Sequence, residues 1–120
     1  MTQSIAFIGL GAMGYRMAAH LPKHFDTVYV WNRNFDKAQQ HAAAFGTVAV
    51  ALEQAVQADI IFSCLPTSQD VESLIDTVQI KSGSFWIDCT SGVPEPAKRI
   101  AAKLKAQNID FLDAPDSGQT

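Results

Sequence analysis

The fold of this chain is decided by the stretch Ile5-Ala-Phe-Ile-Gly-Leu-Gly-Ala-Met-Gly14. Its short apolar run predicts a strand, which leads directly into Gly-x-Gly-x-x-Gly and then into a helical pattern. In that context each glycine has a mechanical role. Gly9 allows a tight turn, Gly11 lets a pyrophosphate approach the backbone, and Gly14 lets the helix pack closely on the strand.

The motif therefore predicts a dinucleotide site. Amide N–H groups at the start of the helix, aided by the helix dipole, would hold the phosphate charge. The alternative is a glycine-rich turn without a ligand, but a strand before the motif and a helix after it favour the site. The residues expected to contact the cofactor in this segment are Gly9, Leu10, Gly11, Ala12, Met13 and Gly14.

Strand and helix patterns alternate along the rest of the chain. Strands are expected at Ile5–Ile8, Thr27–Trp31, Thr47–Val50, Ile60–Cys64, Ser84–Ile87 and Ile109–Leu112. Helices are expected at Ala12–Leu21, from a cap at Asn34 to Phe45 with Gly46 closing it, at Ala51–Gln57, from Ser68 or Asp70 to Thr77, and at Pro94–Gln107. This alternation predicts a doubly wound, parallel-sheet α/β fold of the Rossmann type, with strand order 3-2-1-4-5-6 and helices on both faces. A ligand would bind in the crevice where the strand order reverses.

Size and charge exclude several classes of protein. The chain has 120 residues, 48% of them hydrophobic, and a formal net charge of −3. The length predicts a single domain over residues 1–120. The negative charge argues against nucleic-acid binding, and no apolar run is long enough to span a membrane.

The start of the chain and its cysteines point to a cytoplasmic protein. The first residues carry no pattern of a secretory signal. Cys64 and Cys89 lack metal-ligand spacing and are expected to be small buried hydrophobes in a reducing compartment. We therefore expect no metal site.

The segment after the second predicted strand should select the cofactor. In NAD-selective sites an acidic side chain near this position accepts hydrogen bonds from the ribose hydroxyls. Here the sequence is Asn32-Arg33-Asn34, so no carboxylate repels a 2′-phosphate, and Arg33 can bind that phosphate or lie across the adenine. The alternative is that Arg33 is a solvated loop residue. The segment predicts NADP(H), with NAD(H) less favoured.

Three stretches resemble the β-hydroxyacid dehydrogenase family, which includes 3-hydroxyisobutyrate dehydrogenase, tartronate semialdehyde reductase, glyoxylate reductase and, more distantly, 6-phosphogluconate dehydrogenase. They are Phe7-Ile-Gly-Leu-Gly-Ala-Met-Gly-Tyr-Arg-Met-Ala-Ala-His-Leu21, Asp88-Cys-Thr-Ser-Gly-Val-Pro94 and Phe111-Leu-Asp-Ala-Pro-Asp-Ser-Gly118. The resemblance covers the whole chain. It implies hydride transfer between a nicotinamide cofactor and a small β-hydroxyacid or its aldehyde.

The resemblance also implies further site residues. Leu65, Pro66 and Ser91 would contact the nicotinamide ribose, with Ser91 in place of the family's Thr. Ser117 and Gly118 match the turn that holds the substrate carboxylate.

The sequence departs from the family at three positions. Asp70 stands where the family often has Asn near the nicotinamide end, although it could equally cap a helix. Asp116 replaces an apolar residue and could repel an anionic substrate. Gln119 replaces a glycine and would be strained if that backbone needs a positive φ.

The family continues into an all-helical domain that carries the acid/base lysine and most of the subunit interface, whereas the sequence ends at Thr120. The resemblance thus implies no catalytic residue here, little or no turnover, and substrate binding only if that domain is supplied. Lys98, Lys103 and Lys105 are expected on a solvated helix face. His20, His24 and His41 are expected to be non-catalytic.

Three interpretations stay open at this point. The chain could be the cofactor-binding half of a truncated NADP-dependent hydroxyacid dehydrogenase or aldehyde reductase, which we favour. It could instead be a stand-alone NADP(H)-binding or regulatory module, or a degenerate remnant without binding. Loss of the covering domain would expose apolar surface and a sheet edge near the last strand, which favours a homodimer.

Overall fold

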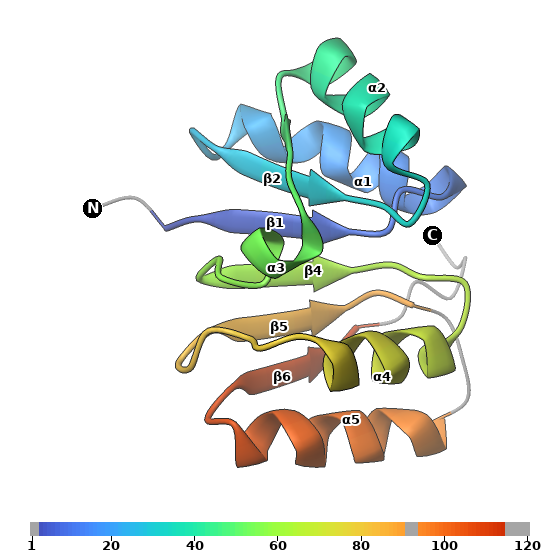
Figure 1. Ribbon diagram of the computed structural model, residues 1–120, viewed down its shortest axis with the longest axis vertical. Helices are drawn as coiled ribbons and strands as arrows, with labels where there is room; N and C mark the ends of the chain where they lie inside the picture. The colour runs from blue at the N-terminus through green and yellow to red at the C-terminus, as the bar shows by residue number, and fades with distance from the viewer. Residues whose placement is uncertain (1–2, 91–93, 115–120) are drawn as a thin grey trace.

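A computed structural model describes residues 3–90 and 94–114, and in these residues six parallel strands form one sheet (Figure 1). The order is β3-β2-β1-β4-β5-β6, with every neighbouring pair parallel. This confirms the predicted doubly wound Rossmann sheet. The strands are β1 (Ile5–Ile8), β2 (Val28–Trp31), β3 (Val48–Ala49), β4 (Ile60–Ser63), β5 (Phe85–Asp88) and β6 (Asp110–Asp113).

Helices cover both faces of the sheet. They are α1 (Ala12–His20), α2 (Phe35–Phe45), α3 (Leu52–Ala55), α4 (Ser68–Thr77) and α5 (Pro94–Ala106). A 3₁₀ turn at Leu21–Lys23 follows α1, so Pro22 ends that helix as predicted. In Figure 1, α3 and α4 lie on the viewer's side of the sheet and α1 lies on the far side. No helix in the described ranges is long and apolar enough to cross a membrane.

Capping residues mark both ends of α2 and the start of α4. Asn34 caps α2 as predicted, because its side-chain oxygen accepts from the amide of Asp36 at 3.2 Å. Gly46 closes the same helix in the left-handed region, with φ +79°. α4 begins at Ser68, one of the two starts that the sequence predicted, and the residue that caps it is Thr67. Because Thr67 holds extended backbone geometry there, its hydroxyl reaches the amide of Asp70.

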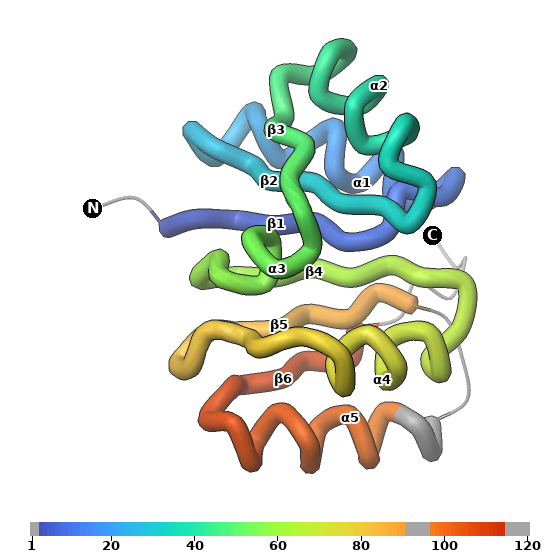
Figure 2. The backbone as a smooth tube through the Cα atoms, viewed as in Figure 1, coloured from blue at the N-terminus to red at the C-terminus, as the bar shows by residue number. Residues whose placement is uncertain are grey.

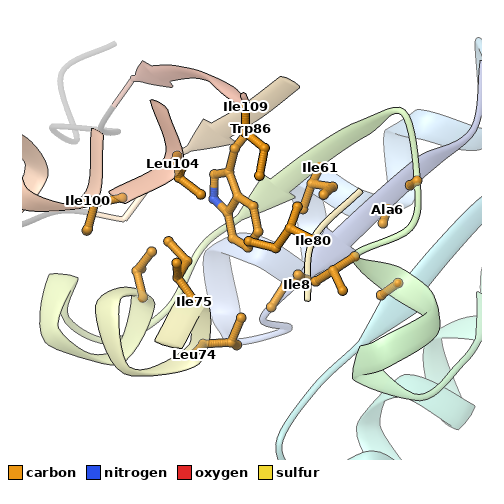
Figure 3. Packing of buried hydrophobic residues seen from close by; sticks show 14 of the residues in the cluster. Ala6, Ile8, Ile61, Leu74, Ile75, Ile80, Trp86, Ile100, Leu104 and Ile109 are labelled. Carbon is orange, nitrogen blue, oxygen red and sulfur yellow. The ribbon is translucent and has the colours of Figure 1, made fainter. Parts of the chain in front are cut away.

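Two apolar clusters lie on opposite faces of the sheet. The larger one surrounds Trp86, which is fully buried among Ile61, Ile80, Leu104 and Ile109 (Figure 3). The other lies under α1 and α2 and is formed by Ile5, Phe7, Leu10, Ala18, Val28, Val30 and Ala38. Every residue of β1 is buried, as expected for a central strand covered on both faces.

The boundaries differ most from expectation in the shortest elements. β3 spans two residues, Val48–Ala49, rather than Thr47–Val50. α3 is one turn long rather than Ala51–Gln57, and β5 and β6 each begin and end one residue later than predicted.

The lysines of α5 differ from the expected solvated face at one position. Lys98 and Lys105 are exposed. Lys103 instead forms ion pairs with Glu72 at 3.0 Å and Asp76 at 2.9 Å, both on α4. Lys103 therefore helps to join α5 to α4.

Apolar side chains remain exposed at the β5–β6 side of the sheet. Phe85 is 38% exposed and Leu112 is 48% exposed. The register places Leu112 beside Ile87, two residues after Phe85 on the adjacent strand. This surface is where the predicted homodimer would form, and the dimer stays a prediction.

Candidate functional site

A cleft of about 620 Å³ opens where the loops after β1, β2 and β4 meet at the carboxyl edge of the sheet. Figure 2 shows the β1–α1 and β4–α4 connections at this edge. The cleft brings together all the predicted cofactor residues that the structure describes, which are Gly9, Leu10, Gly11, Ala12, Met13, Gly14, Asn32, Arg33, Asn34, Leu65 and Pro66. Outside the described residues lie Ser91, Asp116, Ser117, Gly118 and Gln119.

Two of the three glycines are required by backbone packing. Gly9 has φ +99°, and a Cβ there would lie 2.2 Å from the carbonyl oxygen of Cys64. A Cβ on Gly14 would lie 2.2 Å from the carbonyl oxygen of Gly9 and 3.1 Å from the Phe7 ring. The turn and the packing of α1 on β1 thus exclude side chains at both positions, as the motif predicts.

Gly11 stands in open space and begins α1. No heavy atom lies within 4 Å of the position that its Cβ would take. As the N-cap of α1 it provides no side chain to bond the first-turn amides, and that turn carries no acidic residue. Because first-turn amides have no partner inside a helix, this end presents N–H groups and a positive dipole to the cleft. Such an end binds phosphate or another anion well.

Asn32 links the first two loops. Its side-chain oxygen accepts from the amide of Leu10 at 2.8 Å, and its side-chain nitrogen donates to the carbonyl oxygen of Asn34 at 3.0 Å. Sequence reasoning treated Asn32 only as a neutral replacement for a carboxylate. Its structural role, which is to hold the glycine turn against the β2–α2 loop, was missed because both partners are backbone groups.

Cations lie at the β2 side of the cleft. The Arg33 side chain is 85% exposed and lines the cleft together with Lys37 in the first turn of α2. Lys37 was not predicted, although its place one turn after the Asn32-Arg33-Asn34 segment could have indicated it. Trp31, Cys64, Leu74 and Cys89 also line the cleft without having been predicted to contact a ligand.

Asp70 lies beside Arg33, with Asp70 Oδ1 3.9 Å from Arg33 Nη2. The resemblance implied a place near the nicotinamide end. The structure puts this carboxylate next to Arg33, and it confirms the alternative role of Asp70 as a helix-capping residue. A position near the nicotinamide end stays a prediction.

The N-terminus of α4 is closed by its own side chains. The Asp70 amide donates to Thr67 Oγ1 at 3.1 Å, and Asp70 Oδ2 accepts from the Thr67 amide at 3.1 Å and from its hydroxyl at 3.0 Å. This capping box satisfies two amides at the start of α4, those of Thr67 and Asp70, whereas α1 has no side-chain cap.

A buried polar network supports the loop after β4. Asp88, which is 1% exposed, accepts from the Ser63 hydroxyl at 2.9 Å and from the Thr90 amide at 3.0 Å. Trp86 Nε1 donates to Ser63 Oγ at 2.8 Å, and Thr90 Oγ1 accepts from the Leu65 amide at 2.9 Å. The network therefore fixes the backbone of Leu65, one of the predicted cofactor residues.

Acidic and basic side chains lie at opposite sides of this edge of the sheet. Asp113 on β6 pairs in register with Asp88 on β5. Burial, and to a smaller extent the charge of Asp88, raises the pKa of Asp113 above its ordinary value. With Arg33 and Lys37 at the opposite side, an anionic group is favoured near β2 and disfavoured near β6.

His41 has a structural role. Its buried ring contacts Thr47 Oγ1 at 2.8 Å through Nδ1 and the Tyr15 carbonyl oxygen at 3.0 Å through Nε2. Burial lowers its pKa, which the bond to Tyr15 partly offsets. In the part of the chain that the structure describes, none of the three histidines lines the cleft, and no group of three or more potential metal ligands occurs.

Residues 4–120 match the family described as the NAD binding domain of 6-phosphogluconate dehydrogenase. Among curated proteins, the NAD-dependent L-serine dehydrogenase of Pseudomonas aeruginosa is 36% identical, over 98% of this chain and 42% of the relative. The chain thus spans about two fifths of the length of the relatives that it matches.

Solved structures give the same fold. The 3-hydroxyisobutyrate dehydrogenase of Mycobacterium tuberculosis with L-serine has a TM-score of 0.89 and 30% identity, over 98% of this chain and 42% of that one. The reductive aminase of Aspergillus terreus in complex with NADPH and ethyl levulinate has a TM-score of 0.83 and 27% identity, over 94% and 40% of the two chains.

Proposed function

Because the chain belongs to the family of the 6-phosphogluconate dehydrogenase NAD binding domain, we propose that its cleft binds NADP(H) for an oxidoreductase similar to 3-hydroxyisobutyrate dehydrogenase. The reaction would be hydride transfer between the nicotinamide and a small β-hydroxyacid or its aldehyde. The cofactor supplies the hydride chemistry, and the protein's part is to bind and orient it.

The observation that carries the proposal is the open N-terminus of α1. No side chain caps it, and the space around Gly11 is free. The cofactor's pyrophosphate would accept hydrogen bonds from the amides of Gly11, Ala12 and Met13. Charge-assisted bonds of this kind are about twice as strong as neutral ones.

The preference for the phosphorylated cofactor rests on this chain's own residues, because one relative is named for NAD and one neighbour was solved with NADPH. Arg33 and Lys37 supply two positive charges at the β2 side of the cleft. Asn32 carries no charge, and its oxygen is engaged by the Leu10 amide. A 2′-phosphate would therefore meet cations and no carboxylate directly after β2.

The other end of the cofactor would lie against the loop after β4. Leu65 and Pro66 line the cleft there, and Thr90 holds the Leu65 amide. The residues proposed to complete the nicotinamide and substrate contacts are Ser91, Ser117 and Gly118. None of Lys98, Lys103 and Lys105 is among the residues that line the cleft, so we assign them no proton-transfer role.

Isothermal titration calorimetry with NADPH and NADH tests this function directly. We expect one NADPH per chain, bound about tenfold or more tightly than NADH, which matches one charge-assisted contact to the 2′-phosphate. A chain that binds neither nucleotide would overturn the proposal. Equal affinities would overturn the preference while leaving dinucleotide binding intact.

A further inference from the structure

We propose that Asp70 is a specificity-determining residue that weakens the preference for NADP(H), because its carboxylate opposes the 2′-phosphate and competes with it for Arg33. The inference rests on the proposed function and adds an element that acts against it. Its basis is the ion pair of Asp70 with Arg33, because Arg33 lines the cleft although Asp70 itself does not.

The capping box holds the Asp70 carboxylate in place. One oxygen, Oδ2, accepts two hydrogen bonds from Thr67, at 3.0 Å and 3.1 Å. The other oxygen, Oδ1, is the one that lies 3.9 Å from Arg33 Nη2. Turning the carboxylate away from Arg33 would break the cap, so the negative charge stays near the cleft whatever the cofactor.

The ion pair itself contributes little to folding. The Arg33 side chain is 85% exposed and that of Asp70 is 29% exposed, so solvent and salt screen most of their attraction. Arg33 can therefore leave Asp70 easily when a better partner arrives. A 2′-phosphate, which carries more charge and more acceptor oxygens, is such a partner.

The negative charge of Asp70 therefore acts differently on the two cofactors. When Arg33 binds the 2′-phosphate, the Asp70 carboxylate is still held by Thr67 and repels that phosphate. NADH has ribose hydroxyls at that position, which can donate hydrogen bonds to a carboxylate and are not repelled. Asp70 therefore lowers affinity for NADPH selectively, while Arg33 and Lys37 raise it.

The test compares wild type with Asp70→Asn by calorimetric titration of NADPH and NADH. Asn retains a side-chain oxygen for the Thr67 bonds and replaces the oxygen that faces Arg33 with a neutral NH2 group. We expect NADPH affinity to rise about threefold to tenfold, as for two close charges in a high dielectric, with NADH affinity changed by less than about twofold. The gain should shrink in high salt, since mobile ions screen the repulsion.

Glu53→Gln is the matched control, because Glu53 is an exposed carboxylate on α3 that does not line the cleft. It should leave both affinities unchanged. An unchanged ratio of the two affinities in Asp70→Asn, or equal changes for both cofactors, would overturn this inference alone. A wild-type chain that binds neither cofactor would overturn it together with the proposed function.

Discussion

Two helices begin at the same edge of the sheet, and their N-termini are built in opposite ways. α1 starts at Gly11 without a side-chain cap or an acidic residue in its first turn. α4 starts at Thr67 with a complete capping box that ends in the Asp70 carboxylate. Residues of both helices line one cleft. We infer from the difference that an anion binds at the uncapped start of α1 rather than at the capped start of α4, where a carboxylate already occupies the first turn.

The largest expected effect is a difference in folding stability between substitutions at Gly14 and at Gly11, the third and second glycines of the motif. Gly14→Ala should destabilise the fold by about 3 kcal/mol or more, because its Cβ would overlap the Gly9 carbonyl oxygen. Gly11→Ala should change stability by about 0.5 kcal/mol or less, since its Cβ meets open space. Urea unfolding followed by circular dichroism measures both. Similar stability losses in the two variants would contradict the packing account.

Converting the open terminus into a closed one should abolish binding. Gly11→Asp places a carboxylate at the N-cap, where the backbone is already extended, at φ −67° and ψ −173°. Stability should rise by up to about 1 kcal/mol from the new cap. NADPH binding should weaken by about a hundredfold or more, because two or more charge-assisted bonds are lost. Calorimetry and thermal unfolding on the same sample measure the two effects. If Gly11→Asp retained its affinity for NADPH, the start of α1 would not be the site of anion binding.

Removing the Arg33 side chain should lower the affinity for NADPH and leave the affinity for NADH almost unchanged. Arg33→Ala should weaken NADPH binding by about tenfold to a hundredfold, as expected for a charge-assisted contact, with little change for NADH. Lys98→Ala, an exposed cation on α5, is the control and should change neither affinity. Equal losses for both nucleotides would mean that Arg33 contacts a part of the cofactor that they share.

Removing the cap of α4 should cost stability and leave the pyrophosphate contact intact. Thr67→Ala loses the hydroxyl that bonds the Asp70 amide, so we expect a loss of about 1 kcal/mol. NADH affinity should stay within about twofold, because the pyrophosphate is bound at α1. A large loss of NADH affinity in a folded Thr67→Ala variant would show that α4 binds the nucleotide more directly.

The last expected effect is a pH dependence of the free energy of unfolding, which arises from His41 on the α1 side of the sheet. His41 anchors α2 to the Tyr15 carbonyl of α1, and burial lowers its pKa below 6.5. The unfolded chain therefore takes up this proton first as the pH falls. The contribution of His41 is complete above pH 6.5 and is lost below it, at no more than about 1.4 kcal/mol per pH unit. Urea midpoints from pH 7.5 to 5.5 should show a weaker slope in His41→Gln, and identical slopes would contradict this role.

Local sequence determined most of the fold and part of the site. The six strands and the Asn34 and Gly46 caps follow from patterns a few residues long, and the strand order follows from the alternation of strands and helices along the chain. The glycine turn could be predicted because each of its constraints acts on a neighbouring backbone segment. Asn32, Arg33 and Asn34 were placed at the cleft because they follow a strand whose end had to lie there.

The remaining features depend on contacts between distant segments. The ion pair of Arg33 with Asp70 and the contact of Asp88 with Ser63 join residues far apart in the sequence. The burial of His41 depends equally on distant Tyr15. No periodicity encodes such pairings, so the ion pair of Asp70 with Arg33 was missed, whereas the capping role expected of Asp70 as an alternative is confirmed.

The most direct test of the central claim is a ¹⁵N NMR titration of the chain with NADPH, following the backbone amides of both helix starts. The account predicts saturable shifts that are largest at Gly11–Gly14 and smaller at Thr67–Asp70, with the Arg33 side-chain signal moving in step. Saturation with the largest shifts at the α4 amides, or no saturable change at the glycine turn, would contradict it.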